Sequence, residues 1–288
     1  MKLLLILFAF SSVSIAAEPE YLITDPDKKT VQYDGEIVRG SHQALLKHLK
    51  PETEKLRMNS LGGNVEEAIL MAKEIRTRNI QLVVEAACLS SCANYLFLGA
   101  SSKVLGAHAL LGFHGSTKGQ LSTETIASFE SGKLKSTDIT GNRFEDYLTR
   151  VGISELEFLQ SINVDGDLFK EIDSKLKPVI LEEKRTPKKS GSIILITSDK
   201  QWEYQIDDID IAQEKAIELG KSGIKVEMKM EMQIESPASN LAYFPNRETL
   251  EKHGVKGILS YAYPKDASEL KQRVLDSFGT EVNIFGDF

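Results

Sequence analysis

Short apolar runs alternate along the first half of the chain with segments whose apolar residues recur at helical spacing. The runs predict short strands at 30–33, 56–58, 81–84, 103–105 and 110–113. Helical spacing predicts one helix capped by Ser41 and stopped by Pro51, a second from Val65 onward and a third over 93–98. Strands that alternate with helices in this way indicate an α/β fold with a mostly parallel sheet.

The second half of the chain has a different pattern. Segment 115–141 is rich in Ser, Thr, Gly and Lys, which predicts a surface loop with at most a short helix. Helical spacing returns over 144–162, and the charged segment 182–191 indicates a boundary because it contains Pro187 and Gly191. Beyond it the pattern predicts a strand over 193–196, a helix that ends at Gly220 and a half-buried antiparallel strand over 224–234.

The first 16 residues have the pattern of an export signal. Lys2 precedes an apolar run over 3–10, and small residues follow up to Ala16. This order is typical of a secretory signal peptide cleaved after Ala16, and the run is shorter than the roughly 20 apolar residues of a membrane span. We therefore expect an exported protein, periplasmic or secreted, with no stable membrane span once the signal is removed.

Composition narrows the function classes. The chain has 288 residues, of which 41% are hydrophobic and 27% charged, as in soluble globular proteins with one large or two modest domains. A net charge of −7 argues against a nucleic-acid partner, because no basic face dominates. Two cysteines are too few for a disulfide framework.

Three features that can take part in catalysis follow predicted strands. Ser90 lies between a predicted strand and a predicted helix, where a hydroxyl can stand beside free helix N-terminal amides. The turn Gly62-Gly63 also joins a strand to a helix, and its amides can receive an oxyanion. His114 ends a strand 24 residues after Ser90. Each feature alone is weak, because such serines usually cap helices and a lone histidine is usually structural.

The order of these features resembles the proteolytic subunit of the Clp protease. Segment 59–65, Asn-Ser-Leu-Gly-Gly-Asn-Val, resembles its Asn-Ser-Pro-Gly-Gly motif, and Ser90 with Ala93 and Gly99 resembles its nucleophile helix. The remaining similar segments are 33–37, 110–114 and 241–258. The cysteines beside the serine resemble more closely a group of exported bacterial relatives of unassigned activity. The resemblance covers 33–115 well and 144–162 and 241–259 loosely.

The resemblance implies a Clp/crotonase-like (ββα)n spiral and a serine peptidase that cleaves polypeptides through an acyl-enzyme. Ser90 is the implied nucleophile and His114 the implied base. Gly63 and Ser91 would supply oxyanion-hole amides, and Gly62 would shape the turn. No cofactor and no metal are implied. The family also allows for a homo-oligomer.

The chain departs from the family in the segment before its closing motif. Residues 164–237 look like an α+β insertion, which divides the mature chain into a core at 17–163, the insertion, and a closing segment at 238–288. By spacing from Gly254, the family's third catalytic residue falls at Asn240, and Asp167 is the alternative. An asparagine orients an imidazole but does not stabilise its charged form. A catalytically weak or inactive binding or assembly protein is therefore the rival function.

The two cysteines admit three interpretations. Cys88 and Cys92 are four residues apart, within disulfide reach on a helix, so a bridge around the nucleophile turn is one hypothesis. Two buried thiols are the second. The third is zinc, because the pair together with His108 and His114 has the ligand types of a Cys2His2 site.

Overall fold

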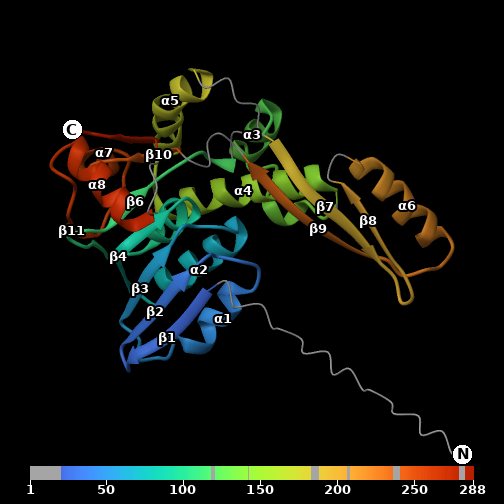
Figure 1. Cartoon of the computed structure of the whole chain (residues 1–288), viewed down its shortest axis with the longest axis horizontal. Coiled ribbons are helices and arrows are strands. Elements are labelled where there is room, and N and C mark those ends of the chain that lie inside the picture. Colours follow the sequence, from blue (N-terminus) through green and yellow to red (C-terminus); the bar gives the residue numbers. More distant parts are fainter. Residues whose placement is uncertain are drawn as a thin grey trace, which may run out of the picture.

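A mostly parallel sheet forms the centre of the molecule. The computed structural model describes residues 21–117, 121–141, 143–182, 188–205, 208–235, 241–278 and 283–288. The sheet has the order β1 (Tyr21–Asp27), β2 (Thr30–Gly35), β3 (Lys55–Ser60), β4 (Gln81–Leu89), β5 (Lys103–Leu105) and β11 (Ile258–Tyr261), and β6 (Leu110–Gly112) also pairs with β4. Only β1 runs antiparallel to its neighbour; the other described pairs of this sheet are parallel. The predicted α/β class is confirmed (Figure 1).

Helices α1 (Ser41–His48) and α2 (Val65–Thr77) connect the first strands. Helix α2 is capped by Asn64, whose side-chain oxygen accepts a hydrogen bond from the Glu67 amide at 3.0 Å. The prediction that Ser41 caps α1 is wrong. Gly40 holds the cap position, and the buried Ser41 hydroxyl bonds instead to the Val38 amide and the Tyr33 hydroxyl.

The helix predicted over 93–98 is a π-helix, η1 (Cys92–Phe97), and every one of its residues is buried. Its apolar side chains join the main hydrophobic core together with the inner residues of β2–β5. Strand β6 is buried on both faces, because Leu111 faces this core and Leu110 a second cluster with Phe244 and Leu270. Two-sided burial explains why β6 is a continuous apolar run.

The segment after β6 contains α3 (Thr123–Glu130), the 3₁₀ turn η3 (Ser136–Asp138), α4 (Phe144–Ile162) and α5 (Asp167–Glu182). The helix predicted over 144–162 is confirmed, and the short helix allowed within 115–141 is α3. Helix α5 was not predicted. Its apolar side chains pack into the main core; they are Leu168, Phe169, Ile172 and Leu176.

Residues 188–235 form a separate unit, here called the outer subdomain. It consists of β7 (Lys188–Ile196), β8 (Gln201–Gln205), α6 (Ile209–Lys221) and β9 (Glu227–Glu235). The strands form an antiparallel sheet of order β8-β7-β9, which confirms the predicted antiparallel strand. Figure 1 shows these elements extending away from the central sheet. Strand β7 begins within the predicted boundary segment.

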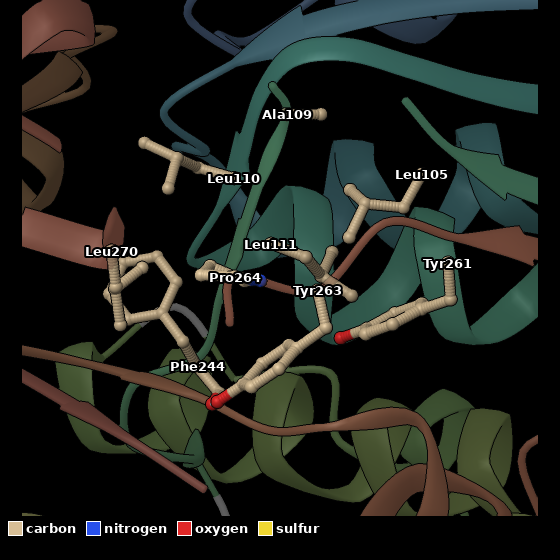
Figure 2. A pocket seen from close by; sticks show the side chains of 9 residues that line it. All are labelled: Leu105, Ala109, Leu110, Leu111, Phe244, Tyr261, Tyr263, Pro264 and Leu270. Carbon is tan, nitrogen blue, oxygen red and sulfur yellow. The ribbon is translucent and has the colours of Figure 1, made fainter. Parts of the chain in front are cut away.

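The closing part of the chain returns to the central sheet. It contains β10 (Leu241–Phe244), α7 (Arg247–Lys252), α8 (Ala267–Phe278) and β12 (Asn283–Gly286), and β10 pairs with β12 in parallel. Beside β10 lies a cavity of about 10 Å³, towards which Phe244, Tyr261 and Tyr263 turn (Figure 2). An apolar space of that size holds no organic ligand. No helix in the described ranges is long and apolar enough to cross a membrane.

Candidate active site

Ser90 occupies a sharp turn between β4 and η1. Its φ is +55°, a left-handed conformation that L residues other than Asn, Asp and Gly seldom adopt. The Ser90 amide donates to the carbonyl oxygen of Gly112 at 3.0 Å, and the Ser90 carbonyl accepts from the Asn94 amide at 2.8 Å. The turn is therefore held by β6 on one side and by its own helix on the other. A strained strand-to-helix turn is the backbone geometry that exposes nucleophilic serines in other hydrolases.

The turn Gly62-Gly63 packs directly against Ser90. A Cβ atom on Gly62 would lie 2.6 Å from the Ser90 Cβ and 2.9 Å from the Ser91 nitrogen, and the Gly62 φ is +99°. Only glycine fits this contact and this conformation. Neither the Gly63 amide nor the Ser91 amide donates a hydrogen bond to any described residue. Two free amides thus belong to two turns that touch each other.

His114 follows the end of β6, the strand that lies parallel to β4. The parallel register pairs Leu89 with Gly112, so Ser90 and His114 leave the same edge of the sheet. On the other side Phe113 exchanges two backbone hydrogen bonds of 2.8 Å with Tyr243 of β10. Burial lowers the pKa of His114, which favours the neutral imidazole. In the described part of the chain no hydrogen bond joins the Ser90 hydroxyl to the His114 ring.

Two residues that the sequence analysis did not select hold the backbone around His114. The Asn94 side-chain nitrogen donates to the carbonyl oxygens of His114 and Gly115, each at 3.1 Å. The Glu155 carboxylate of α4 accepts hydrogen bonds from Ser116 and Thr117. The sequence contains a signal for both residues, because each is a polar residue at a position that the apolar pattern predicts to be buried. Asn94 lies within an apolar run, and Glu155 falls on the apolar stripe of α4.

Cys88 and Cys92 form a disulfide, which confirms the bridge hypothesis. Their Cα atoms are 5.2 Å apart, both side chains are fully buried, and the bridge encloses Ser90. The Cys2His2 zinc alternative is wrong because the disulfide removes both thiolates that it needs. His108 lies in an exposed turn before β6. Among the described residues no group of three His, Cys, Asp or Glu side chains is placed to hold a metal.

The third member of the implied triad is not identified by the structure. Asn240 lies outside the described residues, which resume at Leu241 in β10. Asp167 lies in the first turn of α5, where its exposed carboxylate is 2.5 Å from the Lys170 ammonium nitrogen. The choice between Asn240 and Asp167 therefore stays a prediction.

A hollow of about 730 Å³ opens beside the Gly62-Gly63 turn. It is lined by the chain at the ends of β2, β3 and β4 and by the C-terminal end of α8. Leu61, which follows β3 and lines the hollow, is 56% exposed. The hollow offers space for a ligand next to Gly63, one of the two residues with a free amide.

Comparison with known proteins gives a distant likeness in fold. No protein-family model matches the chain, and no curated protein matches it. Among solved structures, an enoyl-CoA hydratase from Mycobacterium avium subsp. paratuberculosis K-10 is 11% identical with a TM-score of 0.27, over 34% of this chain and 48% of its own. A probable enoyl-CoA hydratase/isomerase from Mycobacterium abscessus is 11% identical with a TM-score of 0.28, over 54% and 61%.

A third structure, an enoyl-CoA hydratase from Mycobacterium smegmatis, is 12% identical with a TM-score of 0.25, over 58% of this chain and 98% of its own. The chain thus spans about half to three fifths of the length of the first two structures. At these values the likeness is a distant one to the crotonase fold. It carries no argument about activity, so the function has to be argued from the residues themselves.

Proposed function

We propose that this protein is a serine hydrolase that cleaves polypeptides through an acyl-enzyme on Ser90. The observation that carries the proposal is the left-handed Ser90 turn, which is packed against Gly62 and flanked by the free amides of Gly63 and Ser91. Strain of this kind, of order 1–3 kcal/mol, persists only where the surroundings determine it, and such sites are often functional.

The chemistry follows from these groups. The Ser90 oxygen attacks the carbonyl carbon of a peptide bond while its proton passes to the His114 ring. The negative charge on the carbonyl oxygen is held by the Gly63 and Ser91 amides. As the carbon–nitrogen bond breaks, His114 returns the proton to the leaving amine. Water then attacks the ester, again through His114, and releases the carboxylic acid and free Ser90.

The environment of His114 suits a general base. Because burial lowers its pKa, the imidazole is neutral near pH 7 and can accept the serine proton. The same burial disfavours the imidazolium formed during the reaction, which a triad aspartate would normally stabilise. With Asn240 as the third member this stabilisation is absent, and we expect slower turnover than that of a complete Ser-His-Asp triad.

The substrate and its location are part of the proposal. The hollow beside Gly62 has room for a side chain next to the bond that is cleaved, and Leu61 offers it an apolar surface. The buried disulfide and the N-terminal signal pattern both support a site outside the reducing cytosol. We extend the proposal to an exported, periplasmic or secreted peptidase that self-associates, as the resemblance implies.

The test is covalent labelling of the purified protein with a fluorophosphonate probe. Wild type is expected to take one label, Ser90→Ala none, and His114→Ala a label at a rate lowered at least a hundredfold. Circular dichroism of each variant shows whether it is folded. Wild type that is folded yet unlabelled after prolonged exposure would contradict the proposal.

A second function has one observation in its favour. Because no described hydrogen bond joins Ser90 to His114, a protein that binds polypeptides without cleaving them remains the alternative. It makes the opposite prediction for the same experiment: a folded, unlabelled wild type that still retains peptides on a column, and a Ser90→Ala variant that retains them equally well.

A further inference from the structure

We infer that Glu155 is a positioning residue that fixes His114 relative to Ser90, an inference that rests on the proposed function. In the described part of the chain its carboxylate accepts hydrogen bonds from four donor groups. The Tyr95 hydroxyl lies at 3.1 Å and the Thr117 amide at 2.9 Å, and the hydroxyls of Ser116 and Thr117 complete the set. One side chain of α4 therefore holds both the nucleophile helix and the loop that leaves His114.

The burial of this carboxylate makes the arrangement unusual. Glu155 is 0% exposed, and no cationic side chain in the described ranges forms an ion pair with it. A buried charge without a counter-ion is unfavourable unless several hydrogen bonds compensate for it. The donors that the structure describes belong to η1 and to residues 116–117. A mutation of Glu155 thus releases contacts at the active site rather than elsewhere in the core.

Asn94 completes the restraint on the same loop. Its side-chain nitrogen donates to the carbonyls of His114 and Gly115, while Glu155 holds Ser116 and Thr117. Each residue from 114 to 117 is thereby tied either to η1 or to α4. Since Ser90 lies two residues before η1, these ties hold His114 and Ser90 in a fixed relative position.

The Tyr95 contact is stable over the pH range of an assay. Burial, with a further contribution from the Glu155 carboxylate, raises the pKa of Tyr95 well above its usual value. The hydroxyl therefore stays protonated and keeps donating to Glu155. A pH profile of labelling then reports His114 and not a loss of this contact.

The experiment compares Glu155→Gln with Glu157→Gln. Glu157 lies two residues further on the same helix and also accepts two hydrogen bonds from a loop, from the amide and hydroxyl of Ser136 at 3.0 and 2.6 Å. It is a matched control because that loop does not include His114. Glutamine keeps one acceptor oxygen but turns an NH₂ group towards donors.

Labelling rates are measured against probe concentration, which separates probe binding from the covalent step. For Glu155→Gln we expect the covalent rate constant to fall at least tenfold, with the apparent binding constant changed less than twofold. Glu157→Gln is expected to label as wild type does. Equal rates in wild type and Glu155→Gln, or equal losses in both variants, would overturn the inference.

Two further measurements keep the inference decidable. If Glu155→Gln does not fold, Thr117→Val replaces it as the test variant. This substitution removes one donor to Glu155 with little change of shape, and we expect its covalent rate constant to be about threefold lower than that of wild type. NMR of ¹⁵N-labelled histidine rings, assigned with His114→Ala, needs no activity. The His114 resonances should shift or broaden in Glu155→Gln and stay unchanged in Glu157→Gln. Unchanged His114 resonances in Glu155→Gln would refute the inference, whether or not the wild-type protein reacts with the probe. Failure of the wild-type protein to react with the probe would refute only the proposed function.

Discussion

The central domain and the outer subdomain bury their apolar side chains to different degrees. In the central domain, all residues of η1 and most inward side chains of β2–β6 are buried in one cluster. Among the outer-subdomain side chains whose burial is described, Ile193 and Ala212 form a buried cluster with Tyr204 and Ile209 packed against it, and Ile211 and Ile217 are each 56% exposed. A strained turn persists only in surroundings that determine it, so the difference explains why the candidate site lies in the central domain.

The largest effect of this difference is expected from glycine substitutions. Gly62→Ala places a methyl group against Ser90 at a φ of +99°. Backbone strain and overpacking together should lower the free energy of unfolding by about 3–6 kcal/mol and abolish labelling of Ser90. Thermal unfolding and probe labelling measure the two effects.

Gly220→Ala in α6 is the matched control in the outer subdomain. A Cβ atom there meets nothing within 4 Å, and the residue lies in a helix. Alanine is the better helix former, so we expect a gain of about 0.5 kcal/mol and unchanged labelling. A Gly62→Ala variant as stable and reactive as Gly220→Ala would show that the Ser90 turn is not held as described.

A buried charge marks the central domain, and it predicts a pH effect. Lys103 of β5 is 1% exposed, its ammonium group donates to the Leu98 carbonyl at 3.0 Å, and burial lowers its pKa from 10.5 to about 7. Lys103 binds its proton more tightly in the unfolded chain than in the folded one. The contribution of Lys103 to the free energy of unfolding therefore rises with pH between about 7 and 10.5 and is constant below about pH 7. Lys103→Met should add about 3 kcal/mol at pH 6, after the lost hydrogen bond is subtracted.

The gain from Lys103→Met should shrink as the pH approaches 10, which urea unfolding at several pH values can follow. A gain that is independent of pH, or a loss at pH 6, would mean that Lys103 is not held as a buried amine. Where side-chain burial is described in the outer subdomain, over 192–205 and 208–228, no charged side chain is buried, so we expect this pH dependence to come from the central domain.

The smallest effect is expected in the outer subdomain. Ile193→Ala removes the centre of its small core and should destabilise this unit by about 2 kcal/mol. Because the unit has its own cluster, the loss should be local. Hydrogen exchange should accelerate in β7–β9 while β2–β6 stay protected, and Ser90 should label as in wild type. Equal acceleration in both regions would show that they unfold as one.

The sequence predicted those parts of the fold whose signals are local. The apolar spacing of 65–77 and 144–162 predicted α2 and α4 because those helices bury one stripe against the core. Strand β1 was missed because its sequence contains Pro26 and two aspartates, which disfavour strands. Helix α5 was missed although Leu168, Ile172 and Leu176 recur at helical spacing.

The candidate site was predictable only in outline. Ser90, His114 and the glycine turn were found because they follow predicted strands. The left-handed Ser90 backbone and the π-helical form of η1 were not, because tertiary packing surrounds both: Ser90 lies against Gly62, and every residue of η1 is buried. Glu155 was also missed: its place on the apolar stripe of α4 marks a buried polar residue, but its partners at 116–117 are nearly 40 residues away and only the tertiary fold brings them together.

The proposed function requires that Ser90 is a nucleophile in a preformed site. The most direct measurement is peptide mapping of the folded wild-type protein after reaction with a fluorophosphonate, with mass spectrometry to locate the adduct. We expect a single adduct on the peptide that contains Ser90 and its loss in Ser90→Ala. An adduct on another residue, or none, would contradict it.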